Sequence, residues 1–313
     1  MSNNEFDKSK VIKYLIWTFI LAYAVQFAAA HVYNGGNKTA ATFIIAAMMF
    51  VPALGALLSG TGLRDMGWKP RIRKNIKTIL IAWFAPILFT ALGAALYFLL
   101  FPGHFSLDGE YVAFNAGEEI FKQLEAQDIS YPVYVLISVI GAAIYGPFVN
   151  MFFALGEEVG WRGFLYPQLK ARFGRNKGLL LGGVIWGAWH WPLIWLIGYE
   201  YGEDYFGYPV VGMLLFLVFT ICLGILCDRL YEKSESIWLP SLFHGAINAA
   251  ATIPLAVCAA HTGSARLLGP VPNGLLAGLP LIVAAVIVFV RGGEKGGRLE
   301  KGERIAVTSR VER

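Results

Sequence analysis

The amino-acid sequence predicts an all-α, polytopic integral membrane protein with about eight transmembrane helices. The first observation behind this fold class is the composition, because 57% of the 313 residues are apolar even before the 35 glycines are counted. A soluble domain is about 45–50% apolar with glycine included and about 25% charged, whereas this chain is 15% charged. The composition excludes an ordinary soluble enzyme, and it also excludes a disordered chain, which is polar and poor in aromatic residues.

The second observation is a series of apolar runs of about 20 residues, the length that a helix needs to cross the hydrocarbon core. In chain order the runs cover 11–30, 40–59, 78–101, 131–156, 179–198, 209–227, 237–260 and 275–290. The longest polar stretches between them are 60–77, 102–130 and 157–178. We expect residues 1–290 to form a single transmembrane domain. The Gly-, Lys- and Glu-rich segment 291–313 is expected to be a disordered cytoplasmic tail.

The third observation is the distribution of Lys and Arg, which gather in the cytoplasmic loops of membrane proteins. With the N-terminus inside, 23 of the 26 Lys and Arg residues fall in cytoplasmic segments, and only Lys38, Lys122 and Arg266 fall outside. Both termini are therefore expected in the cytoplasm. The net charge of +5 marks these loops and implies no nucleic-acid partner.

The end of the first run, Ala28-Ala29-Ala30, resembles a signal-peptide cleavage site. The run is longer than the ~7–15 residues of a signal-peptide core, so we expect it to be retained as the first span. Cleavage there would leave seven spans without moving the later ones.

Ionisable side chains inside spans are functional candidates because they are costly in a bilayer. Of the five histidines, only His190 and His244 lie inside spans, the fifth and the seventh. Both helices start at the cytoplasmic side. At ~1.5 Å per residue, His244 lies about 10 Å and His190 about 16 Å from that start. Glycines at 178, 182, 183 and 187 permit other helices to approach the one that carries His190.

Glu157 and Glu158 lie at the cytoplasmic end of the fourth predicted span. Glu158 and Arg162 are four residues apart on one helix face, so we expect them to form a structural ion pair. Glu157 points about 100° away, and because Gly and Trp occupy its i+3 and i+4 positions we expect it to have no partner. An unpaired carboxylate beside a cavity of low dielectric constant suits a general base. The pair Glu118-Glu119 in an outer loop lacks the following Arg and is interpreted as solvated surface.

The seventh span places His244 and Asn248 four residues apart, so that both face one direction. A His and an Asn that converge on one point can donate hydrogen bonds to a developing oxyanion. Together with Glu157 and His190, they would place chemistry from three spans in the cytoplasmic half of the membrane.

At these residues the sequence resembles the CAAX protease and bacteriocin-processing family (CPBP, or Abi) of membrane-embedded proteases, which is related to type II CAAX prenyl endopeptidases. The family's motifs are Glu-Glu-x-x-x-Arg, an aromatic residue (Phe more often than Trp) four before a His, and His-x-x-x-Asn. They are matched here by Glu157, Glu158, Arg162, Trp186, His190, His244 and Asn248. The resemblance covers about 140–255, and the string 156–167 is similar to one bacterial branch.

The resemblance implies peptide-bond hydrolysis in an intramembrane cavity that opens to the cytoplasmic side. Glu157 would activate water, and His190 would orient that water or bind a metal. His244 and Asn248 would form the oxyanion hole. The supporting residues would be Glu158 and Arg162.

The residues themselves do not decide whether the site holds a metal. Glu157, His190 and His244 could hold zinc with one open position, and the zinc would polarise water. The His-Glu-x-x-His pattern of zinc proteases is absent from the sequence. We therefore favour water attack that depends on the glutamate, with zinc as the one cofactor to test. The expected substrate is a membrane-associated peptide or protein, in the plasma membrane of a prokaryote.

Two other classes of protein compete with the protease. One is a non-catalytic membrane immunity or partner-binding protein of the same family, in which the motifs form a packing network. The other is a proton-coupled transporter, in which Glu157 and the histidines relay protons. A transporter would favour inverted repeats with paired broken helices, and Pro147 in the fourth span has no counterpart in a second half.

Overall fold

The structure is a computed structural model, which describes residues 5–117 and 119–292. In these ranges the regular structure is helical, apart from one isolated bridge between Phe105 and Cys258. The α-helices are α1 (Lys8–Asn34), α2 (Lys38–Met48), α3 (Val51–Leu58), α4 (Ile72–Leu100), α5 (Glu110–Ala116), α6 (Glu119–Ala126), α7 (Tyr131–Ile144), α8 (Gly146–Gly160), α9 (Tyr166–Phe173), α10 (Arg175–Trp189), α11 (Trp191–Ile197), α12 (Val210–Ser234) and α13 (Trp238–Ala256). A π-helix covers Trp161–Leu165, two short 3-10 helices cover Pro102–His104 and Gly263–Leu267, and a last helix covers Leu279–Gly292.

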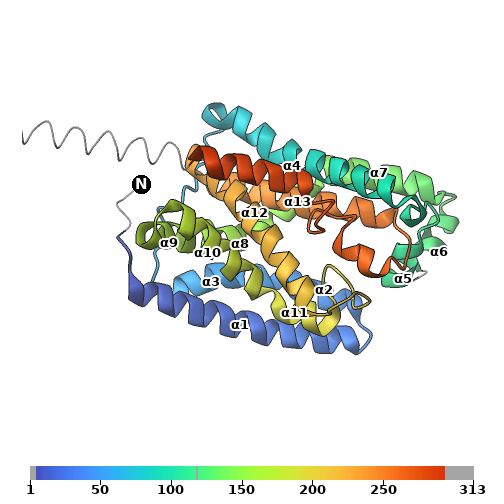
Figure 1. The fold of residues 1–313 in the computed structure, drawn as a ribbon, viewed down its shortest axis with the longest axis horizontal. Helices are drawn as coiled ribbons and strands as arrows, with labels where there is room; N and C mark the ends of the chain where they lie inside the picture. The colour runs from blue at the N-terminus through green and yellow to red at the C-terminus, as the bar shows by residue number, and fades with distance from the viewer. Residues whose placement is uncertain (1–4, 118, 293–313) are drawn as a thin grey trace, which may run out of the picture.

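The helices form one bundle in which the motif-bearing elements are central (Figure 1). The long helices α1 and α4 lie along opposite edges of the molecule, and α8, α10, α12 and α13 lie between them. Helix α13 packs mainly against α8 and α4, while α10 packs against α12 and α9. Close approach of α10 to α12 depends on Gly183, because a Cβ there would lie 2.5 Å from the Cα atom of Ile221. The prediction that glycines in this helix permit other helices to approach is confirmed at Gly183.

The all-helical fold is confirmed, and its candidate spans, which are defined by length and composition, are consistent with a membrane protein. Five helical segments are long and apolar enough to cross a membrane: α1, α2 with α3, α4, α10 with α11, and α12. A sixth is counted if the bent pair α6 and α7 forms one span. The other predicted spans coincide with shorter or less apolar helices, including the 19-residue α13, which carries His244 and Asn248. The number eight therefore stays a prediction.

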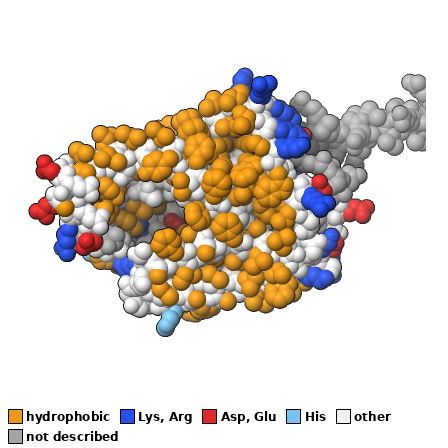
Figure 2. Space-filling view, turned by 180° about the vertical axis from the view of Figure 1, so that it is seen from behind, with side chains coloured by type: hydrophobic (Ala, Val, Ile, Leu, Met, Phe, Trp, Pro, Cys, Tyr) orange, Lys and Arg blue, Asp and Glu red, His pale blue; other side chains and the backbone are white. Residues whose placement is uncertain are grey.

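The molecular surface separates apolar and basic regions as a membrane protein requires. Figure 2 shows apolar side chains over most of the body, with Lys and Arg gathered mainly at one end. Leu99 is 79% exposed and Phe43 is 72% exposed, which suits contact with lipid rather than water. Both ends of the described chain lie at one end of the bundle (Figure 1). That this end faces the cytoplasm stays a prediction.

The ends of the predicted domain are only partly described. The expected cytoplasmic tail, 291–313, lies outside the described residues from position 293 onward. Helix α1 continues through Ala28–Ala30 without a break, and Ala29 and Ala30 are buried. The single transmembrane domain and the limits of its CPBP-like core stay predictions.

The fourth predicted span is divided in two by Pro147. Helix α7 ends at Ile144 and α8 starts at Gly146, because a proline has no N–H group to continue the helical hydrogen bonds. The carbonyl that this bond would have used, that of Ala143, instead accepts a hydrogen bond of 2.8 Å from the indole N–H of Trp83. Trp83 of α4 thus satisfies the carbonyl that the break leaves free, and α8 is a helix separate from α7.

Candidate active site

The last turn of α8 and the π-helix after it carry the Glu-Glu-x-x-x-Arg motif. Glu158 and Arg162 have no exposed surface, and the Nη1 atom of Arg162 lies 3.0 Å from Oε1 of Glu158. The predicted ion pair is therefore confirmed. Arg162 also stacks on two aromatic rings, since its guanidinium carbon is 4.3 Å from the ring centroid of Trp186 and 4.7 Å from that of Tyr166. One turn of π-helix is frequent at functional sites.

Glu157 has hydrogen-bond partners that the sequence did not predict. We expected it to have no partner one helical turn away, but the indole N–H of Trp161 donates to its Oε2 atom over 3.1 Å. The indole N–H of Trp186 donates to the same oxygen over 2.6 Å. The expectation was wrong because it considered only charged partners. The carboxylate is 2% exposed and hydrogen-bonded by two neutral donors, with no ion pair among the described residues.

His190 occupies the single residue between α10 and α11. Pro192 follows two positions later and prevents one continuous helix. The Nδ1 atom of His190 lies 3.0 Å from the carbonyl oxygen of Trp186. Because a carbonyl can only accept, Nδ1 carries the proton, and the Nε2 atom of a neutral ring is left as an acceptor. His190 is 8% exposed, and its ring stacks parallel to that of Tyr199 at a centroid distance of 6.3 Å.

The break at His190 is held by a residue that the sequence reasoning missed. Gln26 of α1 is fully buried, and its side-chain amide donates to the carbonyl of Trp189 over 2.6 Å. Its side-chain oxygen accepts from the N–H of Leu193 over 3.2 Å. The two bonds join the end of α10 to the start of α11 on either side of His190. The signal in the sequence is an uncharged glutamine inside a predicted span, because a side-chain amide in a bilayer needs a hydrogen-bond partner.

Replacing Gln26 by Leu is expected to destabilise the bundle and to slow the reaction proposed below. A buried backbone group left without a partner costs about 1–3 kcal/mol. The substitution removes the side-chain donor to the carbonyl of Trp189, while the N–H of Leu193 keeps its bond to the carbonyl of His190 over 3.1 Å. The melting temperature in detergent measures the effect. Thr18→Val is the matched control on α1, because the buried Thr18 hydroxyl has no hydrogen-bond partner in the part of the chain described. Equal melting temperatures for the two variants would contradict the role of Gln26.

His244 is brought against Glu158 by the packing of α13 on α8. Its Nδ1 atom lies 2.9 Å from Oε1 of Glu158, the oxygen that also accepts from Arg162. The close packing depends on Gly245, because a Cβ there would lie 2.4 Å from the backbone nitrogen of Met151. The contact between the two motifs had not been predicted. Spacing along one helix gives no information about a contact between two helices.

Asn248 lies one turn after His244 on the same continuous helix, as predicted. It is half-buried, whereas His244 is 5% exposed. Within 5–117 and 119–292, no protein group forms a hydrogen bond with its side-chain amide. The amide is therefore available for a substrate.

Trp186 joins all three motifs. Its indole N–H binds Glu157, its carbonyl accepts from His190, and its ring contacts Arg162. The same ring meets the imidazole of His244 edge-on, at a centroid distance of 5.2 Å. The structure therefore places Glu157, His190 and His244 around one side chain.

The arrangement does not fit the zinc site that the sequence left open. Among the described residues, no group of three His, Cys, Asp or Glu side chains lies close enough together to hold a metal ion. No step below is therefore assigned to a metal.

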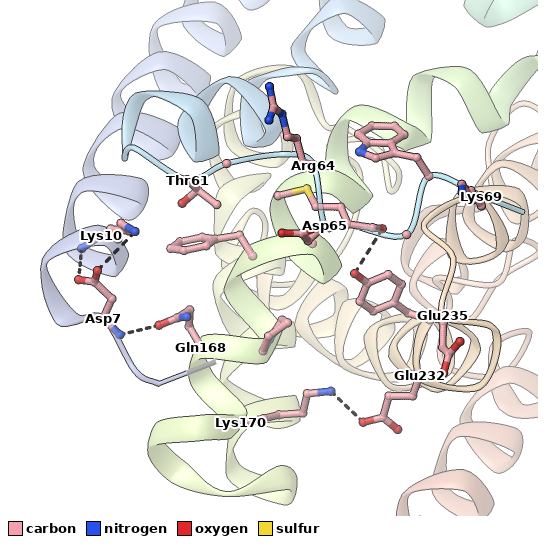
Figure 3. A pocket seen from close by; sticks show the side chains of 18 of the residues that line it. Asp7, Lys10, Thr61, Arg64, Asp65, Lys69, Gln168, Lys170, Glu232 and Glu235 are labelled. Atoms are coloured by element: carbon pink, nitrogen blue, oxygen red, sulfur yellow. Dashed lines mark hydrogen bonds and ion pairs between the residues drawn. The ribbon is translucent and has the colours of Figure 1, made fainter. Parts of the chain in front are cut away.

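A large cavity lies beside the π-helix, and several Lys and Arg residues line it (Figure 3). Its volume is about 1220 Å³, and Gly163 and Phe164 of the π-helix line it. Figure 3 shows charged groups around it, including Lys170, which lies 2.9 Å from Glu232. Glu235 also lines the cavity, and the hydrogen bonds and charges of Lys74 and Arg71 lower the pKa of its carboxyl.

The cavity does not reach the candidate catalytic residues in this conformation. Glu157, His190, His244 and Asn248 are not among its described lining residues. The predicted catalytic cavity on the cytoplasmic side therefore stays a prediction. Because the first three side chains are nearly inaccessible, a substrate requires the bundle to open beside the π-helix or between helices.

Two comparisons identify what the centre of the chain is similar to. Residues 132–250 match the family model of type II CAAX prenyl endopeptidase Rce1-like proteins. The chain is 32% identical over 102 residues to CAAX prenyl protease 2 of Methanococcus maripaludis, a stretch that is 32% of this chain and 37% of that relative. The match thus spans little more than a third of the relative's length. The family-model match runs from α7 to α13 and includes all three motifs. Residues 132–250 are therefore similar to the Rce1-like proteins, in agreement with the CPBP motifs.

Proposed function

We propose that this protein is an intramembrane endopeptidase that hydrolyses a peptide bond of a membrane-associated peptide or protein. The observation that carries the proposal is the arrangement around Trp186, which joins a carboxylate and two imidazoles from three helices. Such a buried set has the groups that amide hydrolysis needs: a base for water, an orienting acceptor and donors for an oxyanion. The Rce1-like match of residues 132–250 supports the same reaction class.

In the proposed reaction, Glu157 takes a proton from water while the oxygen of that water attacks the scissile carbonyl carbon. The unprotonated Nε2 atom of His190 accepts a hydrogen bond from the second O–H of the water and so orients it. The tetrahedral intermediate then collapses, the C–N bond breaks, and Glu157 returns its proton to the leaving nitrogen. The carboxylate is regenerated, so no further reactant is needed.

His244 and Asn248 stabilise the negative oxygen of the tetrahedral intermediate. The Nδ1 proton of His244 is directed at Glu158, so the ring can donate from Nε2 only as an imidazolium. Glu158 compensates that charge, and Arg162 holds Glu158 in place. Asn248 supplies a neutral N–H donor from the next turn. Preorganised donors of this kind are worth about 10²–10³ in rate each.

We further propose that the substrate carries a prenylated C-terminal tail and is cut near the cytoplasmic face. The printed name of the curated relative, CAAX prenyl protease 2, supports this substrate class. The basic end of the bundle and the polar cavity beside the π-helix support an approach from that side. The expected location is the plasma membrane of a prokaryote.

The experiment that tests the function compares peptide ends in membranes from cells that express either wild type or Glu157→Gln at matched levels. New N-termini found only with wild type would identify a protease, its substrate and its cut site. Glu119→Gln is the control, because Glu119 is a solvated glutamate, 70% exposed beside Lys122. It should give the wild-type pattern.

Identical peptide ends from wild type and Glu157→Gln, with both inserted, would contradict the proposal. The result would favour the non-catalytic immunity or partner-binding protein, in which the motifs form a packing network. A phenotype retained by Glu157→Gln would point the same way.

A further inference from the structure

We propose that Trp161 and Trp186 position the catalytic carboxylate, and that Oε1 of Glu157 is the atom that takes the proton from water. The inference rests on the proposed peptide-bond hydrolysis and assigns a role to Trp186, which the motifs use only as an aromatic position, and to Trp161, which occupies an unspecified position of Glu-Glu-x-x-x-Arg. It identifies Trp161 and Trp186 as positioning residues, because they touch Glu157 rather than the substrate.

The geometry separates the two oxygens of the carboxylate. Both indole N–H groups converge on Oε2 of Glu157, at 3.1 Å from Trp161 and 2.6 Å from Trp186. In residues 5–117 and 119–292, no hydrogen bond from the protein reaches Oε1. Two donors from different elements fix the rotation of the carboxylate plane, so Oε1 is held as the free acceptor.

The identity of the donors matters for the chemistry. Glu158 has an arginine partner, whose Nη1 atom lies 3.0 Å from Oε1. Glu157 receives only neutral donors, which hold its position without adding a full positive charge next to the base. The two adjacent glutamates are thus distinguished by their partners: one is an anchor for cations and the other is left able to accept a proton.

Position 186 shows why the role belongs to this chain in particular. The related motif has Phe at this position more often than Trp, and Phe has no N–H group to donate. Here the side chain occupies the same packing position and adds a hydrogen bond to the carboxylate. Trp186→Phe therefore removes one donor while keeping an aromatic ring near Arg162 and His244.

Trp189 provides a matched control. It is fully buried, lies on the same helix and packs edge-on against Trp161. Its indole nitrogen has no hydrogen-bond partner in the part of the chain that the structure describes. Trp189→Phe therefore makes the same change in side-chain volume without removing a bond to Glu157.

The first test reads the indole hydrogen bonds directly and needs no substrate. Protein labelled with ¹⁵N at the tryptophan indoles is studied by NMR in detergent micelles, with signals assigned from the Trp→Phe variants. In Glu157→Gln, the indole signals of Trp161 and Trp186 should move towards the values of weaker hydrogen bonds, while that of Trp189 stays in place. Unchanged signals from Trp161 and Trp186 would overturn the proposal whether or not the protein is a protease.

The second test separates positioning from stability. The probe is an internally quenched, farnesylated peptide with a C-terminal CAAX sequence, in proteoliposomes. We expect Trp186→Phe and Trp161→Phe to lower kcat by roughly 10- to 100-fold, as misplacement of a catalytic group does, with KM changed less than about twofold. Trp189→Phe should keep the wild-type kcat even if its melting temperature falls.

The outcomes distinguish the two proposals. If Glu157→Gln cleaves the probe as wild type does, the proposed function fails. If Glu157→Gln is inactive but Trp186→Phe and Trp189→Phe have equal kcat values, the function stands and the positioning role fails. If wild type does not cut the probe, the indole signals alone decide whether the two tryptophans hold Glu157.

Discussion

Glu157→Gln is expected to reduce kcat by about 10²–10⁴-fold, the range that a general base contributes, without unfolding the protein. The amide oxygen of Gln can still accept from both Trp161 and Trp186 if it takes the place of Oε2. The amide nitrogen then occupies the place of Oε1, where it cannot accept a proton. The substitution thus keeps the packing and removes the chemistry.

The measurement is single-turnover cleavage of the farnesylated, quenched peptide by purified protein in proteoliposomes. Glu119→Gln should match wild type, because its carboxylate is 70% exposed and pairs with Lys122 over 3.7 Å at the surface. Melting temperatures of all three proteins should agree closely. Wild-type cleavage by Glu157→Gln would show that the base lies elsewhere.

What the sequence could predict of the site depends on whether the contact lies within one helix. Glu158 and Arg162 are separated by one turn, so their ion pair follows from the spacing and is found at 3.0 Å. His244 and Glu158 are 86 residues apart, and their contact requires α13 to pack on α8. No spacing argument contains that information.

The residues that were missed are polar but carry no charge. Gln26 and Trp186 lie in apolar runs and Trp161 lies in the polar stretch 157–178, and Trp186 was identified only as the aromatic position of a motif. An amide or an indole N–H in a bilayer also needs a partner, so each was a candidate for a contact between helices. Gln26 finds backbone groups beside His190, and Trp161 and Trp186 find Glu157.

The fold was predictable as a set of apolar helices but not in its breaks. Pro147 and Pro192 were visible in the sequence, yet whether a proline bends or divides a helix depends on what satisfies the freed carbonyl. The indole N–H of Trp83 donates to the carbonyl of Ala143, and the hydroxyl of Tyr23 donates to the carbonyl of Ala188 over 3.1 Å. The break at Pro147 leaves α7 and α8 each shorter than a full span, whereas α10 and α11 together still count as one of the five candidate spans.

Removal of Glu158 is expected to have the largest effect on stability. Glu158→Gln leaves the guanidinium of Arg162 fully buried without a counter-charge, and breaking a buried ion pair costs about 3–5 kcal/mol. The loss of free energy of unfolding is larger because Nε and Nη2 of Arg162 already have no hydrogen-bond partner among the described residues. Unfolding in mixed micelles of increasing denaturing detergent measures the change.

The exposed pair Glu119–Lys122 is the matched control, because surface ion pairs are worth about 0–1 kcal/mol. A decisive comparison is the double variant Glu158→Gln with Arg162→Met, which removes the buried charge that the single variant strands. We expect the double variant to be more stable than Glu158→Gln alone, and a lower stability would contradict the ion-pair explanation. Its cleavage should stay impaired, because His244 still lacks the carboxylate that balances an imidazolium. Stability would then be restored without activity, which separates the structural role of Arg162 from the support that Glu158 gives to the oxyanion hole.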